Sequence, residues 1–194
     1  MRLGGYAARP LVSGTLRPIM DAIAASAPHA RAIRAIHGLL SRIRLDFVFV
    51  GAVGRAAHLG DRVDGGAVDV VATMGPQQKG QIAMMAMNNG FTVDREEVDA
   101  AEELDLIPMR FGDIRVHVLV ASNALYGRMV AEGVAAEFED LTLRVPRRED
   151  FALLLQMSND VEALMRTIES AEFDRESYNR KLSAIGLREY VVPS

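Results

Sequence analysis

The sequence predicts an α+β fold in which a small mixed β-sheet is flanked by helices, with further helices before the sheet and a helical tail after it. Short apolar runs at 47–50 and 67–72 lie on either side of a glycine turn and indicate two buried strands. The segments 114–120 and 141–145 alternate between apolar and polar residues and indicate two more strands. From Arg148 onward, apolar residues recur at helical spacing.

The first 44 residues are expected to form an irregular arm followed by two helices. The arm covers residues 1–14, and apolar residues at helical spacing predict a helix over 15–26. A second helix begins near Pro28, because proline suits the first helical turn. With 194 residues the chain is long enough for one well-packed core, so we expect a single domain over 1–194. Its parts are the arm and helices (1–44), a core (45–146) and a helical tail (147–194).

The core begins with the apolar strand 47–50, after which Gly51 and Gly54 allow a tight turn into a short helix. The next strand, 67–72, is apolar except for one acid, Asp69. A buried carboxylate is costly unless it contacts a metal, a hydrogen-bond donor or solvent. Asp69 is therefore the leading candidate for a functional residue.

The second half of the core contains one helix before strand 114–120 and another after it. The first helix begins at Pro76 and ends at Gly90, and a short strand is expected over 91–93. Its apolar residues, expected in the core, are Ile82, Met84, Met85 and Met87. The acidic segment 94–105 is expected in solvent, and 123–137 is expected to be helical.

The composition excludes several classes of function. With 22 basic and 26 acidic residues the net charge is −4, which provides no overall positive field for nucleic acid. The chain has no cysteine, so disulfides and thiolate metal sites are excluded. It has neither a recognisable signal segment nor an apolar run of about eighteen residues. We expect a cytoplasmic protein with no membrane partner.

The order of these motifs resembles the nucleotidyltransferase superfamily, and in particular its abortive-infection toxin type, over about residues 45–170. The resemblance rests on the strand before GAVGRAAH, the strand carrying Asp69, the segment NNGF, and VPRREDF opening a helix. It implies a nucleotidyltransferase-type sheet and a site where three carboxylates hold two Mg²⁺ ions beside a nucleoside triphosphate. The resemblance also implies nucleotide-binding positions, which are Gly51, Ala52, Gly54, Arg55 and Arg62.

Three of the matched positions depart from the family pattern. Ala52 replaces a second glycine or serine of the turn, and Ala67 replaces the first acid of the Asp-x-Asp pair, whose second acid is Asp69. The third carboxylate position holds His117, and Mg²⁺ prefers oxygen ligands. Asp64, in the loop before the strand, is a candidate replacement, so the candidate metal ligands are Asp69, Asp64 and His117 and the candidate catalytic residue is Asp69.

These departures favour a catalytically degenerate nucleotidyltransferase-like protein that binds a nucleotide, a nucleic acid or an antitoxin-like protein partner. The alternative is an active, diverged, metal-dependent enzyme that modifies RNA or protein, with Mg²⁺ and a nucleoside triphosphate as cofactors; a degenerate site would need none. A weaker alternative is an NAD(P)-binding protein, because Gly51, Gly54 and Ala57 follow a strand at dinucleotide-fingerprint spacing. His58 and His117 are open to both a structural and a functional interpretation.

Overall fold

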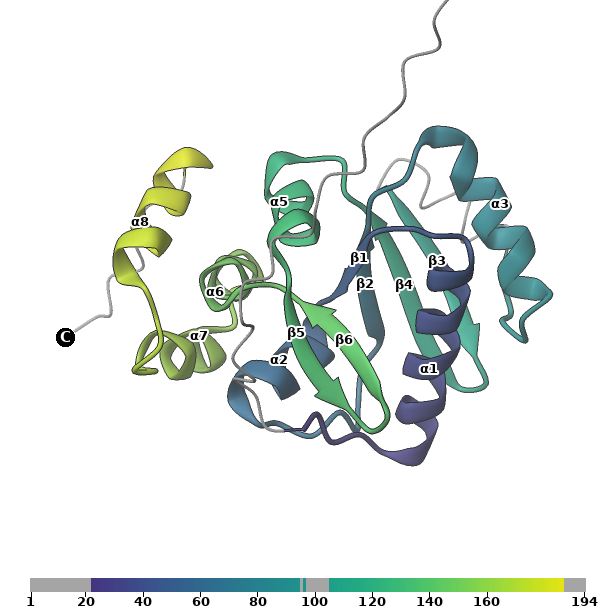
Figure 1. Cartoon of the computed structure of the whole chain (residues 1–194), viewed down its shortest axis with the longest axis horizontal. Coiled ribbons are helices and arrows are strands. Elements are labelled where there is room, and N and C mark those ends of the chain that lie inside the picture. The colour runs from purple at the N-terminus through teal and green to yellow at the C-terminus, as the bar shows by residue number, and fades with distance from the viewer. Residues whose placement is uncertain (1–21, 95, 97–104, 187–194) are drawn as a thin grey trace, which may run out of the picture.

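The computed structural model describes residues 22–94, 96 and 105–186, and in this part of the chain it shows a four-stranded sheet and a separate two-stranded hairpin (Figure 1). The strands are β1 (Phe47–Phe49), β2 (Val68–Ala72), β3 (Leu106–Phe111), β4 (Ile114–Val120), β5 (Val134–Phe138) and β6 (Leu141–Val145). The helices are α1 (Ala27–Arg42), α2 (Gly51–Leu59), α3 (Pro76–Met87), α5 (Ala124–Glu132), α6 (Arg148–Met157), α7 (Val161–Ile168) and α8 (Arg175–Ala184). The predicted α+β class is confirmed.

The sheet is mixed, as predicted. Its strand order is β1-β2-β4-β3, with β2 and β4 parallel and the two outer pairs antiparallel. The hairpin β5-β6 packs with β6 beside β1. Figure 1 shows α6, α7 and α8 gathered at one end of the molecule and α3 at the other.

The strands contribute alternate side chains to two apolar clusters, one on each face of the sheet. Phe47 and Phe49 belong to the first cluster, which also contains the buried face of α1 and the inner face of the hairpin. Val48, Val50 and Val71 belong to the second cluster, which contains the buried residues of α5, α6, α7 and α8. The face that carries Val71 also carries the candidate residue Asp69, which lies two residues before it on β2.

The helix predicted from Pro28 is confirmed as α1, with Ile33, Ile36 and Leu40 fully buried. The helix predicted over 15–26 is wrong for its described residues, 22–26, which are not helical. Here the backbone of Ile23 donates to the carbonyl of Glu137, and Ala24 and Ser26 exchange hydrogen bonds with Val63. These hydrogen bonds satisfy the backbone N–H and C=O groups of the segment in an extended conformation. Contacts with distant segments therefore override the local helical pattern. Residues 15–21 lie outside the described part.

The prediction of one helix over 123–137 is wrong beyond Glu132. Helix α5 ends before Gly133, and the five residues Val134–Phe138 form β5 against β6. Alternating burial along β5, with Ala136 and Phe138 buried, shows a strand with one face in the core. The apolar residues of this segment therefore serve a hairpin that local spacing did not separate from the helix.

Strand β3 was not predicted, and it contains a proline, Pro108, a residue that is rare inside strands. Proline lacks the N–H that an inner strand needs, but β3 is an edge of the four-stranded sheet, where that loss is tolerated. The strand expected over 91–93 is reduced to one bridge between Thr92 and Arg110. Most of the acidic segment 94–105 lies outside the described residues; at its end, Asp105 forms an ion pair of 2.9 Å with Lys79.

Helix α3 was predicted correctly, but its methionines are not all core residues. Ile82 and Ala86 are fully buried, whereas Met84 and Met87 are 57% and 51% exposed. The apolar stripe of α3 is thus narrower than the sequence indicated, because Met84 and Met87 lie outside the face that contacts the sheet.

Candidate functional site

The centre of the candidate site is a hydrogen-bonded pair, Asp69 and His117, on neighbouring parallel strands. The two residues are register partners on β2 and β4, so their side chains lie side by side on the same face of the sheet. His117 Nδ1 lies 2.8 Å from Asp69 Oδ1, and the two side chains are 29% and 28% exposed. The acid of the apolar strand therefore meets a hydrogen-bond donor and remains in contact with solvent.

This hydrogen bond determines the chemistry available to the histidine. An ionised carboxylate only accepts hydrogen bonds, so the N–H of this pair is on Nδ1 of His117, which donates the hydrogen bond to Asp69. The ring orientation is fixed by this contact, and Nε2 has no hydrogen-bond partner among the described residues. A histidine oriented by a carboxylate can accept or deliver a proton through its free nitrogen or bind an anion when charged.

The turn after β1 places backbone directly against Asp69. Gly51 has φ +54°, and a side chain on it would overlap Asp69 Oδ2, with Asp69 Cγ only 3.3 Å away. Helix α2 starts at Gly51 and includes Ala52, so the predicted glycine turn and short helix are present. Gly54 has a packing role, because a Cβ there would lie 3.1 Å from the ring of Phe151.

The structure does not bring together the carboxylates that a two-magnesium site requires. Ala67, directly before β2, offers a methyl group, and Asp64 lies exposed in the loop preceding it. Among the described residues, no group of three or more His, Asp or Glu side chains is arranged to hold a metal ion. One oxygen of Asp69 is already bonded to His117 and the other lies against Gly51. This donor set does not fit two Mg²⁺ ions.

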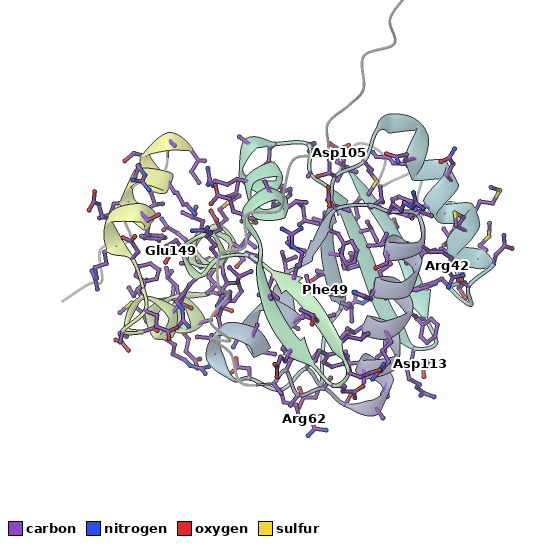
Figure 2. All side chains as sticks on the ribbon, viewed as in Figure 1. Arg42, Phe49, Arg62, Asp105, Asp113 and Glu149 are labelled. Atoms are coloured by element: carbon purple, nitrogen blue, oxygen red, sulfur yellow. The ribbon has the colours of Figure 1, made fainter. Side chains whose placement is uncertain are left out.

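The two arginines predicted to bind a nucleotide are placed differently from each other. Arg55 forms ion pairs with Asp61 and Asp160, and Arg166 joins it on Asp61. Although burial opposes the effect, hydrogen bonds from Arg166 and Arg55 lower the pKa of Asp61. Arg62 is exposed and donates a 3.4 Å bond to the carbonyl of Ala25; its side chain points away from the protein body in Figure 2. Arg55 is therefore committed to a structural ion-pair network.

Sequence reasoning missed two arginines on the same face as the Asp69–His117 pair. Arg115 precedes His117 by two residues on β4, and Arg110 on β3 is the register partner of Arg115. Both are exposed. The signal that could have found them is the alternation of 114–120, which assigns Arg115 and His117 to one side of the strand.

His58 lies at the other end of α2 and is a packed residue. It is 8% exposed, stacks on Phe151 and has Nε2 2.9 Å from the carbonyl oxygen of Pro146. Burial lowers its pKa to about 4; the hydrogen bond to Pro146 opposes this and Arg148 reinforces it. His58 is thus neutral, with Nε2–H donating and Nδ1 buried without a partner among the described residues. It lines an open pocket of about 650 Å³ that is separate from Asp69.

The dinucleotide-binding alternative is wrong. A dinucleotide fingerprint joins two parallel strands through its helix, but β1 and β2, which flank α2, are antiparallel. As for membranes, none of the helices in the described ranges combines the length and apolar character that a transmembrane span needs.

Of three comparisons with known proteins, only the comparison with solved structures gives matches. No protein-family model matches the chain, and no curated protein matches it significantly in sequence. Among the solved structures that match is the crystal structure of ANT(2″)-Ia in complex with adenylyl-2″-tobramycin. The match has a TM-score of 0.48 and 13% sequence identity, and it covers 80% of this chain and 95% of that one.

Proposed function

We propose that this chain is a nucleotidyltransferase-like protein that has lost the metal-dependent reaction and binds a nucleotide, a nucleic acid or an antitoxin-like protein partner. The binding surface is the face of the sheet that carries Asp69 and His117. The observation that supports the proposal is the Asp69–His117 hydrogen bond, which occupies the one remaining acid of the expected metal site with a histidine on the next strand.

The neighbouring residues support the same conclusion. Ala67 has no ligand atom, and Asp64 does not join Asp69 and His117 in a three-ligand group. The reaction that the family resemblance implies needs two metal ions to activate the attacking hydroxyl and to neutralise the triphosphate. One acid and one histidine cannot hold the two metal ions of that reaction, whereas binding of a ligand to this face does not require them.

The decisive experiment compares binding with nucleotide incorporation. The full chain is incubated with each labelled nucleoside triphosphate, Mg²⁺ or Mn²⁺, and a mixed RNA and protein acceptor, beside Asp69→Ala and Asp64→Ala. We expect no incorporation by any of the three. Thermal shifts of the same proteins with the four triphosphates and a single-stranded RNA then identify the ligand, because a ligand that binds only the folded state raises the melting temperature.

The alternative, an active and diverged enzyme, makes the opposite prediction. Incorporation by the natural chain that disappears in Asp69→Ala would establish it, and a further loss in Asp64→Ala would include Asp64 in the metal site. If no nucleotide or RNA stabilises the protein and His117→Ala behaves like the natural chain, only the protein-partner form of the proposal remains.

A further inference from the structure

Two like charges stand directly opposite each other on the candidate face. Arg110 of β3 and Arg115 of β4 are register partners in an antiparallel pair, and both side chains are exposed. Neither forms an ion pair with any residue in the described part of the chain. Opposed like charges destabilise a strand pair, and an anion bound between the two arginines would offset that cost.

These arginines extend the Asp69–His117 pair into one surface. Because side chains two residues apart share a strand face, Arg115 lies beside His117. Pro108 is the register partner of His117, and Arg110 follows it by two residues on β3. Asp69, His117, Arg115 and Arg110 therefore lie on the same side of three adjoining strands, and we call them the arginine face.

The arginine face has the opposite charge from a metal site. Val68 pairs with Val116 at the end of the ladder, and Ala67 and Arg115 directly precede these two residues in the chain. Where the family resemblance calls for an acid, the chain has a methyl group, and the start of the neighbouring strand carries a guanidinium. The arginine face carries the positive charges of Arg110 and Arg115 and the negative charge of Asp69, whose Oδ1 already accepts a hydrogen bond from His117. Asp113, in the turn between β3 and β4, forms no ion pair with either arginine.

Such a surface suits phosphate groups better than a divalent cation. A guanidinium presents a planar fork of N–H donors that matches two phosphate oxygens and keeps its charge at any physiological pH. Two forks on neighbouring strands can each bind one phosphate of a chain of phosphates, and His117 lies next to them with Nε2 unpartnered among the described residues.

We propose that Arg110 and Arg115 bind the phosphates of a small polyphosphate ligand directly, without a divalent metal. This inference rests on the proposed function, because it names the ligand class and the binding mode of that same face. The chemistry is shared by a nucleoside triphosphate and by other polyphosphates, and the experiment below separates the two sources.

Isothermal titration of the full chain in EDTA tests the proposal, with ATP, GTP, CTP, UTP and inorganic tripolyphosphate as probes. We expect at least one probe to bind without metal and to bind more weakly as the salt concentration rises. Arg110→Gln and Arg115→Gln are each expected to weaken binding about tenfold, since each removes a charged hydrogen-bonding group. Arg110→Lys keeps the positive charge but loses the fork of N–H donors, so its affinity should lie between those of the natural chain and Arg110→Gln. A triphosphate that binds more tightly than tripolyphosphate identifies a nucleotide as the source; equal binding identifies the phosphate chain alone.

The matched control is Arg42→Gln. Arg42, labelled in Figure 2, is an exposed arginine on α1, the helix whose buried residues belong to the apolar cluster on the other face of the sheet, and its substitution should leave binding unchanged. Circular dichroism and thermal melting confirm that all variants fold.

Three outcomes would overturn the inference, and they bear differently on the proposed function. Binding that requires Mg²⁺ and is lost in Asp69→Ala would contradict both, because it restores a metal site. Metal-free binding that survives the Arg110→Gln/Arg115→Gln double variant but is lost in His117→Ala contradicts the inference alone. Binding of no probe also contradicts it, and leaves the nucleic-acid and protein forms of the proposed function standing.

Discussion

The carboxylate of Asp69 lies where a side chain on Gly51 would begin, so the first residue of α2 and the one acid of β2 leave no room for a Cβ between them. The backbone N–H of Val50 also donates a 2.9 Å bond to the carbonyl of Asp69. The turn after β1 and the acid on β2 are therefore packed as one unit, in which a change at either residue affects the other.

Replacing Gly51 with alanine tests this unit. The left-handed backbone, with φ +54°, and the overlap with Asp69 Oδ2 both penalise a side chain. We expect Gly51→Ala to lower the free energy of unfolding by about 2 to 4 kcal/mol, measured by urea denaturation. The double variant Gly51→Ala/Asp69→Ala should lose less than the sum of the single losses, because the overlap is removed.

Gly127→Ala is the matched control for that experiment. Gly127 lies within α5, and a Cβ there meets no atom within 4 Å. Alanine favours a helix over glycine, so this variant should gain about 0.5 to 1 kcal/mol. If Gly51→Ala does not lower the free energy of unfolding relative to Gly127→Ala, the contact between Gly51 and Asp69 is not tight.

Gly133 provides a second steric test, without backbone strain. It joins α5 to β5 with φ −52°, and a Cβ there would overlap Val48 and lie 3.2 Å from the carbonyl oxygen of Val145. Gly133→Ala should cost about 1 to 3 kcal/mol of unfolding free energy, measured by thermal melting, because a well-packed site cannot take an added methyl group. The double variant Gly133→Ala/Val48→Ala should lose less than the sum of the two single losses, because the overlap is removed.

The helical tail is held to α5 and α6 by a buried carboxylate. Asp150 is fully buried, 2.6 Å from Lys181 Nζ of α8 and 3.2 Å from Arg128 Nε of α5. Asp150→Ala removes the buried partner of Lys181 and Arg128, leaves Lys181 only its 4.0 Å pair with Glu132, and should destabilise the protein by about 3 to 5 kcal/mol in urea denaturation. Asp140→Ala, which removes an exposed acid paired with Arg34, should show no measurable change. Similar stability of the two variants would contradict the structural role of Asp150.

Acidification should weaken the fold through His58. Its pKa is about 4 in the folded protein, against an ordinary value of 6.5 that applies to the unfolded chain, so the unfolded chain takes up the proton first. The stabilisation is complete above pH 6.5 and is lost as the pH falls toward 4, with a total on the order of 3 kcal/mol.

The measurement is the free energy of unfolding between about pH 7.5 and 4.5 for the natural chain and His58→Gln. Glutamine does not titrate, so the variant should lose less stability over this range, while the contributions of other groups cancel in the difference. Parallel curves for the two proteins would show that His58 is not buried in its neutral form.

Much of the fold could be predicted because its signals are local. The unbroken apolar run Phe47 to Val50, the lone acid in 67–72 and the alternation of 114–120 each identify a strand without knowledge of its partners. Pro28 and the spacing of Ile33, Ile36 and Leu40 do the same for α1. The predictions failed where pairing decides the structure: Ile23 and Val134 lie in extended segments only because Glu137 and β6 satisfy their backbone.

The sequence by itself determined the composition of the core, the order of most elements and the placement of Asp69 on a buried strand, because periodicity and the cost of a buried charge act within a few residues. Only the tertiary structure decided which side chains meet Asp69. The parallel register of β2 and β4 places His117 beside Asp69, and the antiparallel pairing of β4 with the edge strand β3 places Arg110 opposite Arg115 on the same face. Register is a property of two strands distant in the chain, so local spacing cannot specify it.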